Sequence, residues 1–354
     1  MTKKTMSLWA AVSIGIGGMI GAGIFSILGV SAKISGHAMY ISFIIAGLIA
    51  LLCAYSYARL GSTYPSAGGP VEFLVKEYGD GILSGGFNVL LWVGYVFALA
   101  LYARAFGGYA MTFLPSAVPG FWLNILITMI ILVFTGINFI GAKAVGKIEL
   151  IIVATKVVIL LIFVTAGFFF IDSSKLALSN LPQVSNIFYG AGIVFLAYEG
   201  FGLITNAAED MKNPKKTLPK ALFLAVIITM IIYILVSLTV LGNLPIADIV
   251  NAKDYALAAA AEPFLGNIGF TFIAIAALFS TSSAINATLY GGANVSYLVA
   301  KHGELPSIFE RKIWGQSTEG LFITSLIVIV FANFLNLDGI AMPVSYTHLT
   351  LPTN

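Results

Sequence analysis

Long apolar stretches separated by short polar segments make up most of this sequence. Each stretch has about 20 residues or more, the length at which an α-helix crosses the hydrocarbon core of a bilayer. The stretches lie at residues 8–32, 38–61, 82–113, 121–141, 148–171, 186–207, 218–242, 267–299 and 319–336. This pattern predicts an all-α membrane protein with nine transmembrane helices, the last of them only marginally long.

Two of the nine stretches carry clusters of glycine, which is a poor helix former. The first contains GIGGMIGAGIF at residues 15–25, and the sixth contains YGAGIVFLAYEGFG at residues 189–202, with the ionisable Glu199 inside it. We therefore expect both helices to be interrupted. Broken helices in the first and sixth positions of two five-helix halves are typical of inverted-repeat secondary transporters, whose substrate site lies between the breaks.

The polar segments between the stretches are short, and the pattern changes after residue 336. Residues 244–266 form a loop in which we expect a short helix at 254–262. Nine helices cannot form two complete halves of five. We therefore expect one transmembrane transporter domain over residues 1–342, incomplete at its C-terminus, followed by an off-pattern tail at residues 343–354 that is not part of the fold.

The charged residues indicate how the chain is oriented. Only 9% of the residues are charged, against roughly a quarter in a soluble domain. If the N-terminus is cytoplasmic, thirteen of the 18 cations fall on the inner side, namely Lys3, Lys4, Arg59, Lys76, Lys143, Lys147, Lys212, Lys215, Lys216, Lys220, Lys301, Arg311 and Lys312. This asymmetry predicts a multi-pass protein of the cytoplasmic membrane, with no need for a nucleic-acid partner.

Other classes of function find little support in the residues. No Ser/His pair, HExxH motif or pair of aspartates lies within a span, so we do not expect an intramembrane enzyme. The single cysteine, Cys53, rules out an intrachain disulfide and a cysteine-based metal site. The three histidines are isolated from one another, so we expect neither a metal nor a cofactor.

The glycine cluster of the first stretch has two interpretations. Gly17 and Gly21 form a small-xxx-small pair, which lets helices pack closely. Alternatively, the helix unwinds between Gly18 and Gly23. The exposed N–H groups at the positive end of the second half-helix could then bind a carboxylate, and the carbonyls ending the first half could bind an ammonium group.

Several motifs resemble those of one transporter family. GGMIGAGIF in the first stretch is similar to the GxxIGxGIF signature of the amino acid, polyamine and organocation (APC) family, and FLAYEGFGLITNAAEDMKNPKKTLPKA at 195–221 resembles its sixth helix and following loop. PSAGGP at 65–70 resembles its loop after the second helix. The similarity extends from about residue 7 to 342 and is closest to proton-coupled amino acid transporters of the ApcT type. The family has ten core helices.

The resemblance implies a LeuT-like fold of five plus five helices and a set of substrate contacts. The substrate carboxylate would meet the backbone at Gly21, Ala22 and Gly23. The substrate amine would meet carbonyl groups near Met19 and from Leu196 through Tyr198 to Glu199.

Lys156 lies about eight residues inside the fifth stretch, or roughly 12 Å from its start. The lysine either extends to the membrane surface or is a functional ionisable group inside the membrane. Burial favours the neutral form of a lysine, so such a group could exchange a proton. The resemblance implies that Lys156 occupies the position at which sodium-coupled relatives bind a cation. This position would lie near Gly17 and the serines of the eighth helix, Ser280 and Ser283.

Glu199 also has two interpretations. It is either a buried carboxylate that accepts hydrogen bonds from the glycine-rich backbone, or a group that selects a cationic substrate or titrates with Lys156. Arg104, within the third stretch, is expected to be structural or to extend to the membrane surface.

Taken together, these features predict a secondary transporter that takes up amino acids coupled to protons, by alternating access around the first and sixth helices. The expected partners are the amino acid, protons and the lipid bilayer. A polyamine or cationic amino acid exchanger is the nearest alternative, and an amino acid sensor that does not transport is another.

Overall fold

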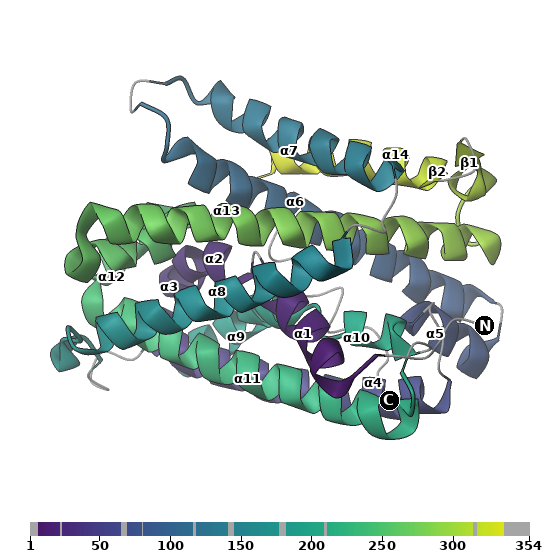
Figure 1. The fold of residues 1–354 in the computed structure, drawn as a ribbon, viewed down its shortest axis with the longest axis horizontal. Helices are drawn as coiled ribbons and strands as arrows, with labels where there is room; N and C mark the ends of the chain where they lie inside the picture. Colours follow the sequence, from purple (N-terminus) through teal and green to yellow (C-terminus); the bar gives the residue numbers. More distant parts are fainter. Residues whose placement is uncertain are drawn as a thin grey trace.

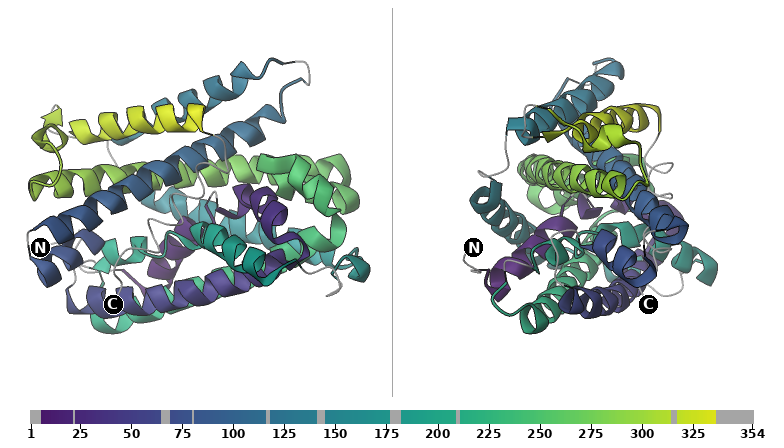
Figure 2. Two further views of the ribbon diagram at one scale, coloured as in Figure 1. Left: turned by 180° about the vertical axis from the view of Figure 1, so that it is seen from behind. Right: turned by 90° about the vertical axis from the view of Figure 1, so that its right-hand side faces the viewer.

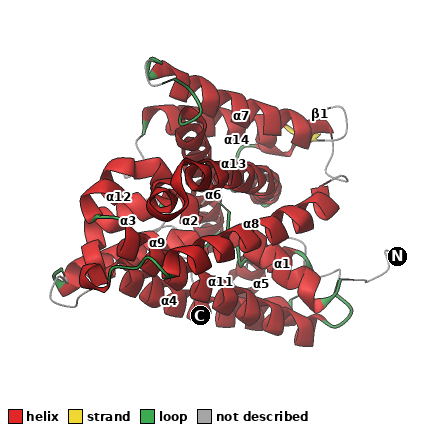
Figure 3. Cartoon of the chain, turned by 60° about the vertical axis from the view of Figure 1, so that its left-hand side comes forward, coloured by secondary structure: helices red, strands yellow, loops and turns green. Residues whose placement is uncertain are grey.

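The computed structural model describes residues 6–21, 23–64, 69–79, 81–115, 118–140, 145–176, 182–208, 211–313 and 317–335. Nearly all of this part of the chain is helical, as the red elements of Figure 3 show. The longer helices are α1 (Leu8–Met19), α3 (Leu28–Ser35), α4 (Met39–Thr63), α5 (Pro70–Tyr78), α6 (Ile82–Met111), α7 (Phe121–Ile140), α8 (Val145–Phe168), α9 (Val184–Tyr198), α11 (Pro214–Asn243), α13 (Ala256–Lys301) and α14 (Glu319–Phe334).

Short elements connect these helices. They are the short helices α2 (Gly23–Ser26), α10 (Leu203–Asn206) and α12 (Ile246–Ala252), the 3₁₀ turns η1 (Gly36–Ala38), η3 (Ser173–Leu176), η6 (Lys253–Tyr255) and η7 (Ser307–Glu310), and the two-residue strands β1 (Lys312–Ile313) and β2 (Ser317–Thr318). The two strands pair antiparallel before α14.

The helix ends follow from local chemistry. The Ser7 side chain accepts a hydrogen bond from the N–H of Ala10 and so caps α1. Prolines occupy the first position of α5 and of α11, where the missing N–H costs no hydrogen bond. Gly266 has φ 63° and ψ −163°, so α13 consists of a short helix before this residue and a long one after it. The short part begins at Ala256, close to the predicted helix at 254–262, whereas α12 was not predicted.

Each of the nine predicted spans falls on helical structure: 8–32 contains α1, α2 and most of α3, 186–207 contains most of α9 and all of α10, and each of the others lies mainly on a single helix. Seven helical segments of the described residues are long and apolar enough to cross a membrane. The apolar part of α8, at 152–168, and α14 are shorter than these. The all-α membrane fold is therefore confirmed, whereas nine crossings and the five-plus-five repeat stay predictions.

The helices form two groups with α8 between them (Figure 1). In one group α4 packs on α9 and α11, and α1 packs on α11. In the other, α6 packs on α7, α13 and α14 (Figure 2). Helix α8 contacts α1 and α11 on one side and α13 on the other. The broken segments α1–α2 and α9–α10 therefore lie inside the molecule, where two groups of helices meet.

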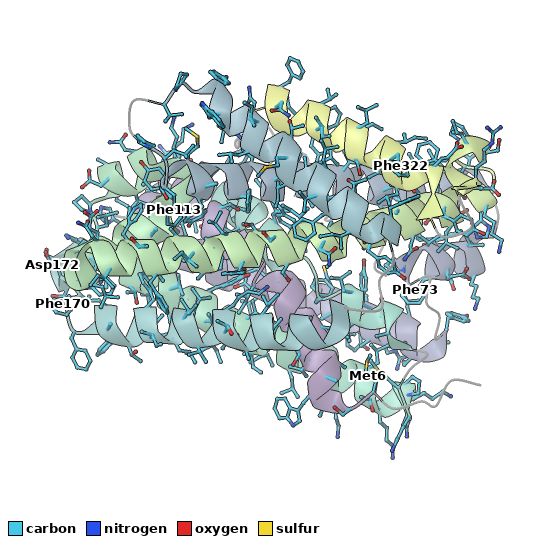
Figure 4. All side chains as sticks on the ribbon, turned by 45° about the horizontal axis from the view of Figure 1, so that its top comes forward. Met6, Phe73, Phe113, Phe170, Asp172 and Phe322 are labelled. Carbon is cyan, nitrogen blue, oxygen red and sulfur yellow. The ribbon has the colours of Figure 1, made fainter. Side chains whose placement is uncertain are left out.

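Labelled side chains show which segments lie at the two ends of the molecule (Figure 4). Phe170 and Asp172, which follow α8, lie at one end, and Phe73 of α5 lies toward the opposite end (Figure 4). Met6 lies on the same side as Phe73 and forms a parallel bridge with Met211. The N-terminal segment is therefore tied to the segment that precedes α11. Residues 343–354 and Ala22 lie outside the described residues.

Candidate functional site

The first helix is interrupted between Met19 and Gly23. Helix α1 ends at Met19, and Ile20 has φ −77° and ψ 51°, outside the helical region. Gly21 lies in the bend that follows. Gly23, which we expected in the bend as well, is already the first residue of α2. A Cβ atom on Gly23 would lie 2.6 Å from Ala197 Cα, so glycine is required here by close packing rather than by backbone conformation.

The second interruption lies directly beside the first. Helix α9 ends at Tyr198, and Glu199 is extended, with φ −57° and ψ 147°. Gly200 has φ +112°, a conformation that strongly favours glycine. A Cβ atom on Gly200 would lie 2.5 Å from the carbonyl carbon of Gly18, and one on Gly18 would lie 3.0 Å from the Gly200 oxygen. The two breaks therefore touch through their glycine backbones.

A tyrosine of α11 joins the ends of the two half-helices. The Tyr233 hydroxyl lies 2.6 Å from the carbonyl oxygen of Met19 and 2.9 Å from that of Ala197, so its single proton can serve either acceptor. Tyr233 is fully buried. No sequence pattern had singled out this residue, because one tyrosine in an apolar helix looks like any other core side chain.

An open cavity, whose volume of about 750 Å³ includes space open to solvent, adjoins the second break. Its walls come from α1, α4, α5, α6, α13 and the segment from α9 through α10. The lining residues are Gly18, Cys53, Tyr57, Pro70, Leu91, Tyr95, Ala98, Tyr102, Phe195, Glu199, Gly200, Phe201, Gly202, Leu203 and Thr288. The cavity therefore combines aromatic rings with one carboxylate and contains no basic side chain among these residues.

The residues expected to bind substrate divide into two sets. Glu199 lines the cavity directly. The other described members are buried at or beside the breaks, and these are Met19, Gly21, Gly23, Leu196 and Tyr198. At the first break, the cavity wall is formed by Gly18. The Tyr198 hydroxyl donates to the carbonyl of Phe43 in α4 at 2.8 Å, so this side chain anchors α9 to α4.

Lys156 lies inside the protein, against the first break. Its side chain is 2% exposed, and Nζ donates to the carbonyl oxygen of Gly17 at 3.5 Å. From the other side, the Ser280 hydroxyl of α13 lies 2.8 Å from the carbonyl oxygen of Gly21 and 3.1 Å from that of Ile20. The carbonyl groups at the C-terminal end of α1 and in the bend after it are therefore contacted by side chains of both α8 and α13.

The structure also shows where Ser283 and Arg104, both considered in the sequence analysis, are located. Ser283 is buried on α13, three residues after Ser280. Arg104 donates to the carbonyl oxygen of Ala332 at 3.2 Å, in the last turn of α14. A cation at a helix C-terminus satisfies a free carbonyl and interacts favourably with the helix dipole.

In the described part of the chain, no three His, Cys, Asp or Glu residues are grouped so that they could hold a metal ion.

Comparison with known proteins agrees with this architecture. The chain is 48% identical over 342 residues to an uncharacterized protein of Methanocaldococcus jannaschii, covering 96% of this chain and 79% of that protein. It is 37% identical to the inner membrane transport protein YbaT of Escherichia coli, covering 98% and 81%. It is 29% identical to the chloroplastic cationic amino acid transporter 9 of Arabidopsis thaliana, covering 87% and 57%. The profile of the family described as amino acid permease matches residues 6–348. The chain therefore belongs to the amino acid permease family.

Proposed function

We propose that this protein takes up an amino acid across the cytoplasmic membrane, coupled to protons, by alternating access around the breaks in α1–α2 and α9–α10. Membership of the permease family makes it a transporter rather than an enzyme. In this proposal the N-terminus is cytoplasmic, as the distribution of Lys and Arg predicts. The observation that carries the coupling is the contact between buried Lys156 and the Gly17 carbonyl at the first break.

The substrate would bind mainly to backbone groups. Its carboxylate would accept hydrogen bonds from the N–H groups of Gly21 to Gly23, at the start of α2. Its ammonium group would lie at the carbonyls that end α1 and α9, near Met19 and Leu196. Because the Tyr233 hydroxyl already lies at 2.6 Å from the Met19 oxygen, an ammonium group there would share this acceptor or displace the tyrosine.

The proton would bind and leave at Lys156. The protonated amine holds the end of α1 against α8, while Ser280 holds the same segment against α13. The neutral amine carries no charge to attract the Gly17 carbonyl, so this contact weakens. Gly17, Ser280 and Ser283 thus form the surroundings through which the charge on Lys156 would control the position of α1 relative to α8 and α13.

Replacement of Lys156 tests this coupling. Lys156→Ala, and Lys156→Met as a variant of similar length, should retain substrate binding but lose accumulation driven by a pH gradient in proteoliposomes with an alkaline interior. Lys220→Ala, which changes an exposed lysine of α11, should transport normally. If either Lys156 variant still concentrates substrate when only a proton gradient is present, the coupling residue lies elsewhere.

A second candidate is exchange or uptake of cationic amino acids or polyamines. It is favoured by Glu199, the one carboxylate among the residues that line the cavity. The name of the relative in Arabidopsis thaliana, a cationic amino acid transporter, also supports this second candidate. Aromatic rings, of which this cavity has several, also attract cations.

Glu199→Gln separates the two candidates. A charge-assisted hydrogen bond contributes about 1.5–3 kcal/mol. Loss of this bond should therefore weaken lysine or polyamine binding about tenfold or more, while alanine binding changes little. Isothermal titration of the purified protein with lysine, spermidine and alanine measures the difference. Equal losses for all three ligands would assign Glu199 to structure and remove the cationic candidate.

A further inference from the structure

Helices α4 and α11 lie side by side at one edge of the molecule (Figure 2). They pack closely, because a Cβ atom on Gly47 would lie 2.5 Å from Met230 Sδ, and one on Gly61 would lie 2.7 Å from Leu218 Cδ2. The later position in α4 thus faces the earlier position in α11. The two helices are therefore antiparallel.

Each of these helices exposes one line of side chains that is apolar along most of its length and cationic at one end. The line on α4 is Leu48, Leu52, Tyr55 and Arg59, and the line on α11 is Leu235, Ile231, Ile227, Lys220 and Lys216. Spacings of three, four or seven residues keep side chains on one side of a helix. The sequences of α4 and α11 contain no acidic residue, so the charge of both lines is purely positive.

The two lines face the same side of the helix pair. Leu48 directly follows Gly47 at the contact between the helices, and Ile231 directly follows Met230. One residue turns an α-helix by about 100°, so both side chains point about a quarter turn away from the contact. In two antiparallel helices, the same sense of rotation leads to the same side of the pair. The two lines therefore form one exposed apolar face.

The cations of the two lines lie at the same end of this face. Arg59 precedes Gly61 by two residues, and Lys220 follows Leu218 by two, so both cations start at one level of the antiparallel pair. Lys216 lies about one turn further toward the end. Long cationic side chains here can reach the headgroups of a bilayer while their apolar stems stay against the lipid chains.

The acidic residues of the neighbouring segments lie on other elements. They are Glu72 and Glu77 in α5, Glu149 in α8, Glu199 in the cavity wall, and Glu209 and Asp210, which lie outside the described residues. The helices α5 and α8 each carry a lysine within a few residues of these acids, Lys76 and Lys147. The outward face of α4 and α11 thus adds positive charge that these two helices do not balance.

We propose that this face binds an anionic phospholipid, with the phosphate at Arg59, Lys216 and Lys220 and the acyl chains along the apolar lines of α4 and α11. The line from Arg59 to Leu48 is about 16 Å long, close to half of the hydrocarbon core of roughly 30 Å. The face therefore matches one lipid leaflet in length, in apolar surface and in the sign of charge at its end. The match is the same whichever side of the membrane is cytoplasmic.

Two other occupants fit this face less well. A soluble anion would use the cations but leave the apolar lines without a function. A second copy of the chain, related by a twofold axis along the membrane normal, would bring the same cations close together. The lipid also has a direct route to the transport site, because Cys53 and Tyr57 of α4 line the cavity.

Native mass spectrometry of the purified full chain in detergent tests the site. The probes are phosphatidylglycerol, which is anionic, and phosphatidylcholine with the same acyl chains, which is zwitterionic. A cation near a lipid phosphate contributes about a fivefold change in affinity. Arg59→Gln should therefore weaken phosphatidylglycerol binding about fivefold, and Lys216→Gln combined with Lys220→Gln about 25-fold. Phosphatidylcholine binding should change little in these variants, and glycerol 3-phosphate, which has no acyl chains, should bind far more weakly than phosphatidylglycerol.

Two control variants make the result specific to this face. Arg59→Lys keeps the charge and should bind phosphatidylglycerol as the unchanged protein does. Lys301→Gln removes an exposed cation of α13, in the other helix group, and should also bind normally. All of these side chains are exposed, so the variants should fold, and their melting temperatures in detergent check this.

Several outcomes would overturn the proposal. They are equal binding of the two lipids by the unchanged protein, an undiminished preference in the glutamine variants of Arg59, Lys216 and Lys220, and an equal loss in Lys301→Gln. Binding of glycerol 3-phosphate as tight as that of the lipid would assign the cations to a soluble anion. A dimer that phosphatidylglycerol does not dissociate would assign the face to a second copy. None of these measurements depends on transport, so the result is independent of the role of Lys156.

Discussion

At the scale of single residues, the centre of the molecule depends on two glycines whose backbones touch. Gly18 lies one residue before the end of α1, and Gly200 lies in the break after α9, at a positive φ angle. A side chain at Gly200 would meet backbone atoms of Gly18 and Met19, which cannot rotate out of the way. The contact between the two interrupted helices therefore requires glycine for both steric and conformational reasons.

Gly200→Ala should therefore be strongly destabilising. A positive φ angle costs a residue with a Cβ atom about 1–2 kcal/mol, and overpacking adds typically about 1–3 kcal/mol. We expect a large loss of melting temperature or failure to fold, measured by fluorescence-detected thermal unfolding. Gly136→Ala in α7 is the matched control, because its Cβ atom would meet nothing within 4 Å. A Gly200→Ala protein as stable as Gly136→Ala would show that the breaks do not touch.

The sequence predicted the residues with unusual chemistry better than it predicted their contacts. Glycine clusters and a lysine inside an apolar stretch differ from their surroundings, so Gly200 and Lys156 could be recognised directly. Tyr233 could not, because its importance comes from the place where α11 crosses the two breaks. The helical conformation of Gly23 was also missed, because glycine permits both a bend and close packing.

At the scale of elements, the first helix is held on three sides by hydrogen bonds to its free carbonyls. Tyr233 of α11 reaches Met19, Lys156 of α8 reaches Gly17, and Ser280 of α13 reaches Gly21. An interrupted helix leaves carbonyls without intrahelical partners, and these must be satisfied inside a membrane protein. The three neighbouring helices supply the donors, so the break is stable and its position is sensitive to each of them.

Tyr233→Phe should loosen the ends of both half-helices. The change removes the hydrogen bond to the Met19 or Ala197 carbonyl without changing the shape of the ring, and leaving a buried acceptor unsatisfied costs about 1–3 kcal/mol. We expect a lower melting temperature together with altered transport. Tyr198→Phe is the comparison, because its hydroxyl bonds the Phe43 carbonyl in α4 and not the first break. This second variant should lose similar stability but keep transport closer to normal. If both variants transport equally, the link between the breaks has no role in the transport cycle.

At the scale of the whole molecule, the cavity lies toward one end. Pro70, which begins α5, lines it, together with Cys53 and Tyr57 from the part of α4 that leads to this end. Toward the other end, α3 packs on α12, and a Cβ atom on Gly29 would lie 2.7 Å from the Lys253 carbonyl oxygen. The cavity therefore lies on the side of the N-terminus, whereas α3 and α12 are tightly packed at the other end.

The fold could be predicted from the sequence at this scale only in part. The apolar stretches located the helices, because length and hydrophobicity decide whether a segment can span a bilayer. The division into two helix groups could not be predicted, since lipid-facing and buried sides of these helices are almost equally apolar. For example, 44% of one 18-residue window within residues 28–63 is buried, and 22% of one within 121–139, although both windows are strongly apolar.

Cys53, the single cysteine in the sequence, can be used to test from which side of the membrane the cavity is accessible. Because its side chain lines the cavity, a membrane-impermeant thiol reagent should reach it from the side of the N-terminus but not from the opposite side. The experiment uses sealed vesicles of known orientation, with Cys53→Ser as the background control. If the protein alternates between two access states, saturating alanine or lysine should change the labelling rate severalfold, because bound substrate closes or fills the cavity. Equal labelling from both sides, unaffected by either amino acid, would contradict alternating access around this cavity.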